Sequence, residues 1–193
     1  MKQGKKTKKS TAQKRFAQGD LLYHVIHGVC RVKEILKQEQ SGKSILCYCL
    51  VPVVTSYMNV RFVVAVDGIQ SSGFHLLLTQ KEANKVLDYL KSGEPIVYPV
   101  DAGEEVVSVS FAEENESWAL AKTILSCSHE KSEIKDQRKR KALERSAKGL
   151  IGELAYVFQI PLKEAAERVR HCLECGSNVN PMVLSALVHA TEE

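Results

Sequence analysis

The sequence contains no long apolar run. No stretch of its 193 residues approaches the roughly 20 apolar residues that a membrane-spanning helix needs. The first ten residues are rich in lysine, and no apolar segment of the kind found in secretory signals follows them. We therefore expect a protein of the cytoplasm that does not enter the membrane. In that compartment the six cysteines are expected to remain free thiols.

Motifs that carry catalysis are also missing. The sequence has no Gly-rich phosphate loop, no H-E-x-x-H and no G-x-S-x-G. Cys30 with nearby His27 resembles a thiolate nucleophile, but no orienting acid is close to them in sequence. We therefore predict that the chain is not an enzyme, uses no cofactor and takes no small-molecule substrate.

A zinc site would need ligands from separate segments. The only C-x-x-C runs from Cys172 to Cys175 and follows His171. A tetrahedral zinc site needs four ligands, so this motif would have to borrow them, for example from Cys47 and Cys49. We predict no metal, and a zinc- or thiol-dependent enzyme stays open as an alternative.

Charge is distributed unevenly along the chain. Residues 1–15 hold seven bases and no acid, and residues 131–148 hold eight bases and three acids. Between them, residues 94–116 hold seven acids and no base. This pattern favours a partner with polyanionic parts, such as nucleic acid. A solvated, disordered tail explains residues 1–15 equally well.

The first half of the chain has the pattern of a small β module. Short segments rich in β-branched and aromatic residues alternate with turn residues such as Gly19-Asp20 and Asp67-Gly68. The predicted strands are 21–24, 29–38, 45–51, 59–66 and 73–78. Five short strands in so small a segment suit a small barrel or a strongly bent sheet, and we predict a five-stranded β-barrel.

The pattern then changes to helical. Thr79 and Glu82 form a capping box before a short helix, which we expect to close the β module. One short strand is expected near Val106–Phe111, within an acidic connector. The later helices carry Trp118 on a core face, and Gly149 and Gly152 predict the close approach of a neighbouring helix. The predicted organisation is α+β: a basic tail (1–15), a β module with its closing helix (16–93), an acidic connector (94–116) and a helical domain (117–193).

A cluster of bases falls at the start of the longest predicted helix. Arg138, Lys141 and Arg145 lie about one helical turn apart, and Lys139 stands among them. Such a face can contact phosphates, so we name these four residues as candidate DNA-binding residues. A solvated helix face, with local pairs to Glu144, is the alternative interpretation.

Several motifs together resemble the CarD/CdnL family of bacterial transcription regulators. The opening carries an aromatic residue, Gly19-Asp20, an apolar pair, Tyr23 and His27-Gly28 before a strand. Later segments match the family in order and spacing. The matching segments are 16–32, 48–50, 58–63, 73–74, 139–143 and 150–155.

The resemblance implies a Tudor-like module that binds the β subunit of RNA polymerase. It also implies a helical domain that holds promoter DNA open at the upstream edge of the bubble. Arg61 matches the family arginine that contacts polymerase, and Val60, Phe62 and Met58 are its candidate neighbours. An RNA- or ribosome-associated binding protein remains the alternative.

The sequence also departs from the family pattern. His24 stands where the family usually has proline, and Gly73-Phe74-His75 lacks the usual arginine. The family's wedge tryptophan has no match, although Tyr98 lies near its position, between acids. Polymerase docking is therefore better supported than insertion of Tyr98 into DNA.

Overall fold

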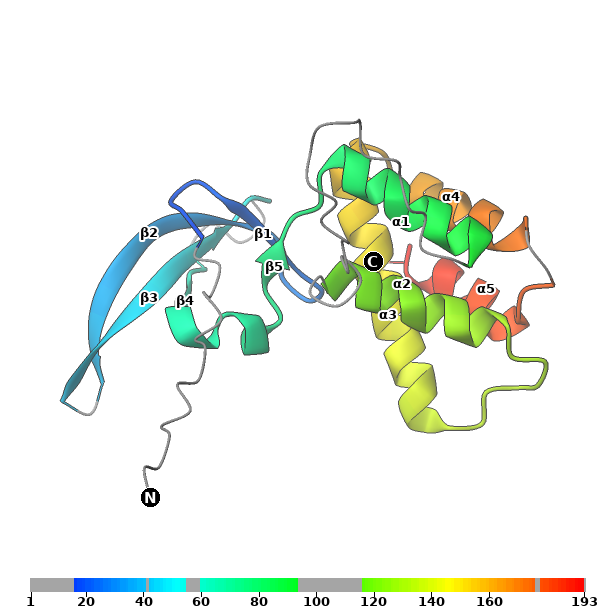
Figure 1. Ribbon diagram of the computed structural model, residues 1–193, viewed down its shortest axis with the longest axis horizontal. Helices are drawn as coiled ribbons and strands as arrows, with labels where there is room; N and C mark the ends of the chain where they lie inside the picture. Colours follow the sequence, from blue (N-terminus) through cyan, green and yellow to red (C-terminus); the bar gives the residue numbers. More distant parts are fainter. Residues whose placement is uncertain (1–15, 41, 55–59, 94–115, 176–177, 193) are drawn as a thin grey trace, which may run out of the picture.

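A sheet and a group of helices lie side by side in the computed structural model (Figure 1). The structure describes residues 16–40, 42–54, 60–93, 116–175 and 178–192. The predicted α+β class is confirmed, with the strands first and the helices after them. The predicted strand near Val106–Phe111 and the basic tail lie outside the described residues.

The sheet is antiparallel and open. Its strands are β1 (Leu21–His24), β2 (Gly28–Gln40), β3 (Lys43–Pro52), β4 (Phe62–Ala65) and β5 (His75–Leu76). They pair in the order β4-β3-β2-β1-β5, so β4 and β5 form the two edges. The closed barrel predicted from the sequence is therefore not seen among the described residues.

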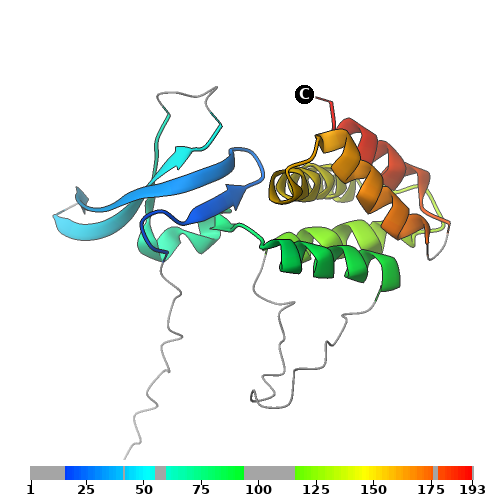
Figure 2. The same ribbon diagram turned by 90° about the horizontal axis from the view of Figure 1, so that it is seen from above.

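The strand bounds explain why the sheet stays open. β1 agrees with its prediction, whereas β2 and β3 form a longer hairpin that extends beyond the other strands (Figures 1 and 2). β4 and β5 are shorter than predicted because two 3-10 turns, η2 (Val66–Gly68) and η3 (Gln70–Ser72), occupy the chain between them. A five-stranded closure needs longer edge strands than these.

One face of the sheet carries its core. Leu22, Cys30, Val32 and Leu50 are fully buried there, and Phe74 packs with them. Side chains alternate along a strand, so the neighbours of these residues lie on the opposite face. We call that opposite face the outer face of the sheet.

Five helices make up the second part. They are α1 (Gln80–Ser92), α2 (Glu116–Ser128), α3 (Gln137–Phe158), α4 (Leu162–Glu174) and α5 (Pro181–His189). Their buried faces form one core around α3, which includes Trp118 as predicted. No helix among the described residues has the length and apolarity to cross a membrane.

The position of α1 differs from its prediction. The capping box is present, since Thr79 accepts from the Glu82 amide and the Glu82 carboxylate accepts from the Thr79 amide at 2.8 Å. The buried residues of α1, however, belong to the helical core, where α1 packs chiefly on α4 and α2. The expectation that α1 closes the β module was wrong, because its apolar face is buried against α4 and α2 instead of the sheet.

Two glycines of α3 allow the sheet to approach the helices. A Cβ at Gly149 would lie 2.9 Å from Val25, in the turn between β1 and β2, and 2.9 Å from Leu120 of α2. A Cβ at Gly152 would lie 2.5 Å from the Tyr23 hydroxyl oxygen. The predicted close approach is present at both glycines, but a neighbouring helix, α2, contributes only at Gly149. The β1–β2 hairpin supplies the other contacts.

A buried carboxylate completes this junction. Glu153 of α3 is 0% exposed and accepts from the Leu78 amide at 3.0 Å and the Ser117 hydroxyl at 2.7 Å. The Nε2 atom of His75, in β5, lies 3.3 Å from the same carboxylate. Groups from β5, its connection to α1, and α2 therefore converge on one side chain of α3. This network fixes the sheet against the helices.

Candidate protein and nucleic-acid interfaces

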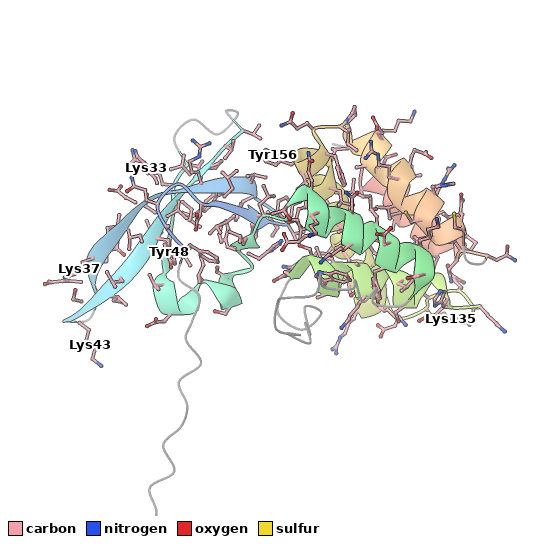
Figure 3. The ribbon with its side chains drawn as sticks, turned by 45° about the horizontal axis from the view of Figure 1, so that its top comes forward. Lys33, Lys37, Lys43, Tyr48, Lys135 and Tyr156 are labelled. Carbon is pink, nitrogen blue, oxygen red and sulfur yellow. The ribbon has the colours of Figure 1, made fainter. Side chains whose placement is uncertain are left out.

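The sequence-predicted Arg61 lines a groove on the outer face of the sheet. The groove has a volume of about 650 Å³, and its lining includes Val60 and Arg61 just before the edge strand β4. Arg31 and Lys33 of β2 line the same groove, together with Val51, Pro52 and Val53. We call this feature the basic groove. Figure 3 shows Lys33 on the long hairpin, at some distance along it from Lys37 and Lys43.

Strand register explains how these bases meet. Arg31 pairs with Val51, and Val63 pairs with Cys49 on the same outer face. A β-bulge between Val32 and Glu34 gives Lys33 no register partner in β3 and interrupts the alternation there, and Arg31 and Lys33 both line the groove. Sequence reasoning missed both residues because the pairing of β2 with β3 had to be known first. The alternation of charged and apolar residues in β2 was the available signal.

Phe62, another predicted neighbour of Arg61, does not line the groove. Phe62 pairs with Leu50 and lies on the core face, with its ring centroid 4.2 Å from that of His27. It supports the strand rather than lining the groove. Met58 lies outside the described residues.

The basic groove offers both charge and an open strand edge. Among the described residues, no ion pair involves Arg31, Lys33 or Arg61. Val60 and Val63 are 38% and 47% exposed, which places apolar surface beside these cations. Among the residues that the structure describes, β4 pairs with β3 alone, which leaves its other edge unpaired there. An edge of this kind can accept a further strand.

A second basic surface runs along α3. Arg138, Lys141, Arg145 and Lys148 are exposed and follow one another at intervals of three and four residues, so they lie on one helix face. We call these four residues the α3 stripe. None of them takes part in an ion pair among the described residues. A row of cations without acidic partners is suited to a phosphate backbone.

Lys139 does not belong to this stripe. Its ammonium group forms an ion pair with Glu130, and the next residue, Arg140, pairs with Glu133 at 2.8 Å. Both pairs connect the start of α3 to the segment before it. Among the candidate DNA-binding residues of α3, we therefore leave out Lys139 and add Lys148. Tyr98 lies outside the described residues.

The α3 stripe approaches the β1–β2 turn. Burial lowers the pKa of His24 in that turn, and the nearby charges of His27 and Arg145 lower it further. The His24 Nδ1 atom accepts from the amides of Ile26 and His27, at 3.1 and 3.2 Å. These bonds hold the turn in place and leave Ile26 74% exposed.

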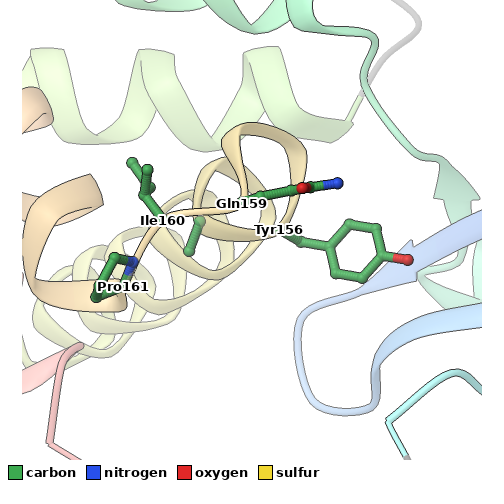
Figure 4. Close-up of a pocket in the computed structure, with 5 residues that line it drawn as sticks. Tyr156, Gln159, Ile160 and Pro161 are labelled. Carbon is green, nitrogen blue, oxygen red and sulfur yellow. The ribbon is translucent and has the colours of Figure 1, made fainter.

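A second hollow lies at the end of α3, and few reactive groups line it. Its lining includes Tyr156, Gln159, Ile160 and Pro161, and its volume is about 680 Å³ (Figure 4). Gln159 adopts a left-handed conformation that ends the helix. The lining has no carboxylate, imidazole, thiol or ammonium group. It offers an apolar surface with one phenol and one amide.

The thiols do not form the sites weighed from the sequence. Cys30 is 0% exposed, and burial raises the pKa of its thiol to about 11, the opposite of an activated nucleophile. Cys47 and Cys49 are buried in β3, whereas the C-x-x-C lies on α4. Within the part of the chain that the structure describes, no three His, Cys, Asp or Glu side chains are placed to hold a metal ion.

Comparisons with known proteins add no assignment. No protein-family model and no curated protein sequence matches this chain. Functional inference therefore depends on the two basic surfaces and on the resemblance described above.

Proposed function

We propose that this chain is a transcription regulator that binds the β subunit of RNA polymerase and changes the stability of the open promoter complex. In this proposal the open sheet is a Tudor-like module, and the basic groove is its polymerase-binding surface. The observation that carries the proposal is the convergence of Arg31, Lys33 and Arg61 in one groove on the sheet. The proposal assigns the chain no covalent chemistry.

The groove favours a particular mode of docking. A segment of the partner can add as a strand to β4, with backbone hydrogen bonds supplying affinity. Acidic side chains on that segment would face Arg61, just before β4, and apolar ones would cover Val60 and Val63. Arg31 and Lys33 lie two strands away on β2 and would meet a part of the partner that covers the groove itself. Buried arginines often dominate such interfaces, because the guanidinium group forms bidentate bonds with carboxylates.

The α3 stripe supplies the proposed contact with promoter DNA. A chain docked on polymerase needs only a few phosphate contacts to favour the open over the closed complex, since tethering raises the local concentration of its DNA surface. Arg138, Lys141, Arg145 and Lys148 provide up to four such contacts. Tyr98 keeps its sequence-based role as a candidate wedge.

Charge reversal in the groove tests the docking. We expect Arg61→Glu to abolish binding to a purified fragment of the polymerase β subunit, because a carboxylate would face the acidic partner. Binding is measured by pull-down or by surface plasmon resonance with the full chain. Lys43→Glu is the matched control, since Lys43 is exposed at the tip of the β2–β3 hairpin and does not line the groove. It should bind as the wild type does.

Two results would contradict the docking proposal. One is a wild-type chain that does not bind the β fragment. The other is an Arg61→Glu chain that is folded by circular dichroism and binds normally. In the first case, tight and salt-sensitive binding to RNA without polymerase would favour the alternative of an RNA- or ribosome-associated protein, for which the α3 stripe is the supporting observation.

A further inference from the structure

Two thiols and an imidazole lie together at the end of α4. Cys175 is exposed at the C-terminal cap of the helix, and its Sγ atom lies 3.9 Å from Nε2 of His171. Cys172 lies three residues before Cys175, so the two side chains project from the same side of the last helical turn. Residues at this spacing have Cα atoms about 5 Å apart, within the range that a disulfide bridges.

The remaining cysteines are in different surroundings. Cys30, Cys47, Cys49 and Cys127 are each at most 4% exposed. Burial raises the pKa of Cys127 as it does that of Cys30, which keeps both as thiols. A thiolate is the reactive form, and it must be reachable from solvent. The pair on α4 therefore differs from the other four cysteines in exposure.

The two thiols of the pair differ from each other. Cys172 is half-buried and packs against the helical core, and burial raises its pKa, with Cys175 and Asp88 of α1 raising it further and Lys91 lowering it. Cys175 faces solvent beside His171, which can accept its proton. An exposed attacking thiol beside a shielded second thiol is the arrangement found in redox-sensing cysteine pairs.

We propose that Cys172 and Cys175 are a redox-modification site that reduces a peroxide and closes an intrahelical disulfide. The Cys175 thiolate, its proton passed to His171, attacks one peroxide oxygen. An S–O bond forms, the O–O bond breaks, and the leaving hydroxide takes the proton from His171 to become water. The Cys172 sulfur then attacks the sulfenic sulfur. An S–S bond forms, the S–O bond breaks, and a second water leaves with the Cys172 proton.

The experiment treats the full chain with hydrogen peroxide near neutral pH. Thiols are counted by maleimide labelling after unfolding, and the disulfide is located by mass spectrometry of peptides. We expect the loss of two of the six thiols and one disulfide between Cys172 and Cys175. Cys172→Ser should leave a sulfenic acid on Cys175 that dimedone captures. Cys127→Ser, the control at a buried thiol, should give the same disulfide as the wild type.

The role of the imidazole has its own measurement. His171→Gln should slow oxidation several-fold near neutral pH and react at the wild-type rate at alkaline pH, where hydroxide can accept the thiol proton in place of the imidazole. If wild type and His171→Gln oxidise at equal rates at every pH, His171 does not accept the proton of Cys175. The proposal as a whole fails if the six thiols oxidise at similar rates, or if Cys175 stays a sulfenic acid in the wild type. Neither result depends on polymerase binding.

Discussion

Replacement of Glu153 by alanine is expected to lower the free energy of unfolding by about 3 to 5 kcal/mol. The carboxylate is fully buried and accepts from the Leu78 amide and the Ser117 hydroxyl, with His75 beside it. Alanine would leave the buried Leu78 amide without its acceptor and would remove the carboxylate that joins Ser117 and His75 at the junction between the sheet and the helices. In the unfolded chain these groups form hydrogen bonds with water, whereas in the folded variant they would be buried away from it. Urea denaturation of the purified variant measures the loss.

Two variants serve as controls for this prediction. Glu153→Gln keeps an acceptor oxygen and the side-chain volume, so we expect a smaller loss of about 1 to 2 kcal/mol. Glu144→Ala removes an exposed carboxylate from the same helix and should change stability by less than about 0.5 kcal/mol. A Glu153→Ala variant as stable as Glu144→Ala would show that the network does not hold the two parts together.

Gly152→Ala is expected to destabilise the protein by about 1 to 3 kcal/mol, although alanine favours helix. The new Cβ would lie 2.5 Å from the hydroxyl oxygen of Tyr23, a side chain that is buried and cannot move aside freely. The helix-propensity gain of about 1 kcal/mol is smaller than the cost of this overlap. Thermal or urea unfolding of wild type and variant gives the difference.

A second mutation reverses the sign of this effect. In a Tyr23→Phe background the clashing oxygen is gone, and the nearest ring carbon lies 3.6 Å from the new Cβ, an ordinary contact distance. Gly152→Ala should then be neutral or stabilising by up to about 1 kcal/mol. If it costs the same in both backgrounds, the contact between Tyr23 and α3 is not what requires glycine.

Local features of the fold could be predicted from the sequence. The capping box of α1 and the limits of β1 depend on neighbouring residues, and both were predicted correctly. The class was also evident from the change from alternating to helical periodicity. Closure of the sheet was not predictable in this way, because it depends on η2 and η3, where Asp67-Gly68 and Ser71-Ser72 were interpreted as simple turns.

Long-range contacts account for what the sequence left undetermined. The packing of α1 on α4 and α2 involves residues far apart in the chain, and an apolar stripe does not name its partner. The same holds for the candidate sites. Arg61 was singled out by a resemblance, but Arg31 and Lys33 reach it only through strand pairing. The ion pair that removes Lys139 from the α3 stripe likewise depends on the loop before the helix.

Two variants matched in charge test whether the α3 stripe acts through its position or only through its net charge. One variant replaces three bases of the α3 stripe by glutamine, and the control replaces three exposed lysines of α1 and α4, so that both lose the same net charge. The stripe set is Lys141, Arg145 and Lys148, and the control set is Lys81, Lys91 and Lys163.

The lifetime of open promoter complexes, measured after a competitor DNA is added to purified RNA polymerase, tests the central claim most directly. The account predicts that the wild-type chain and the control variant change this lifetime equally. It predicts that Arg61→Glu and the stripe variant have little effect at the same concentration, the first because docking is lost and the second because phosphate contacts are lost. An unchanged lifetime with the wild-type chain, or an equal change with Arg61→Glu, would contradict it.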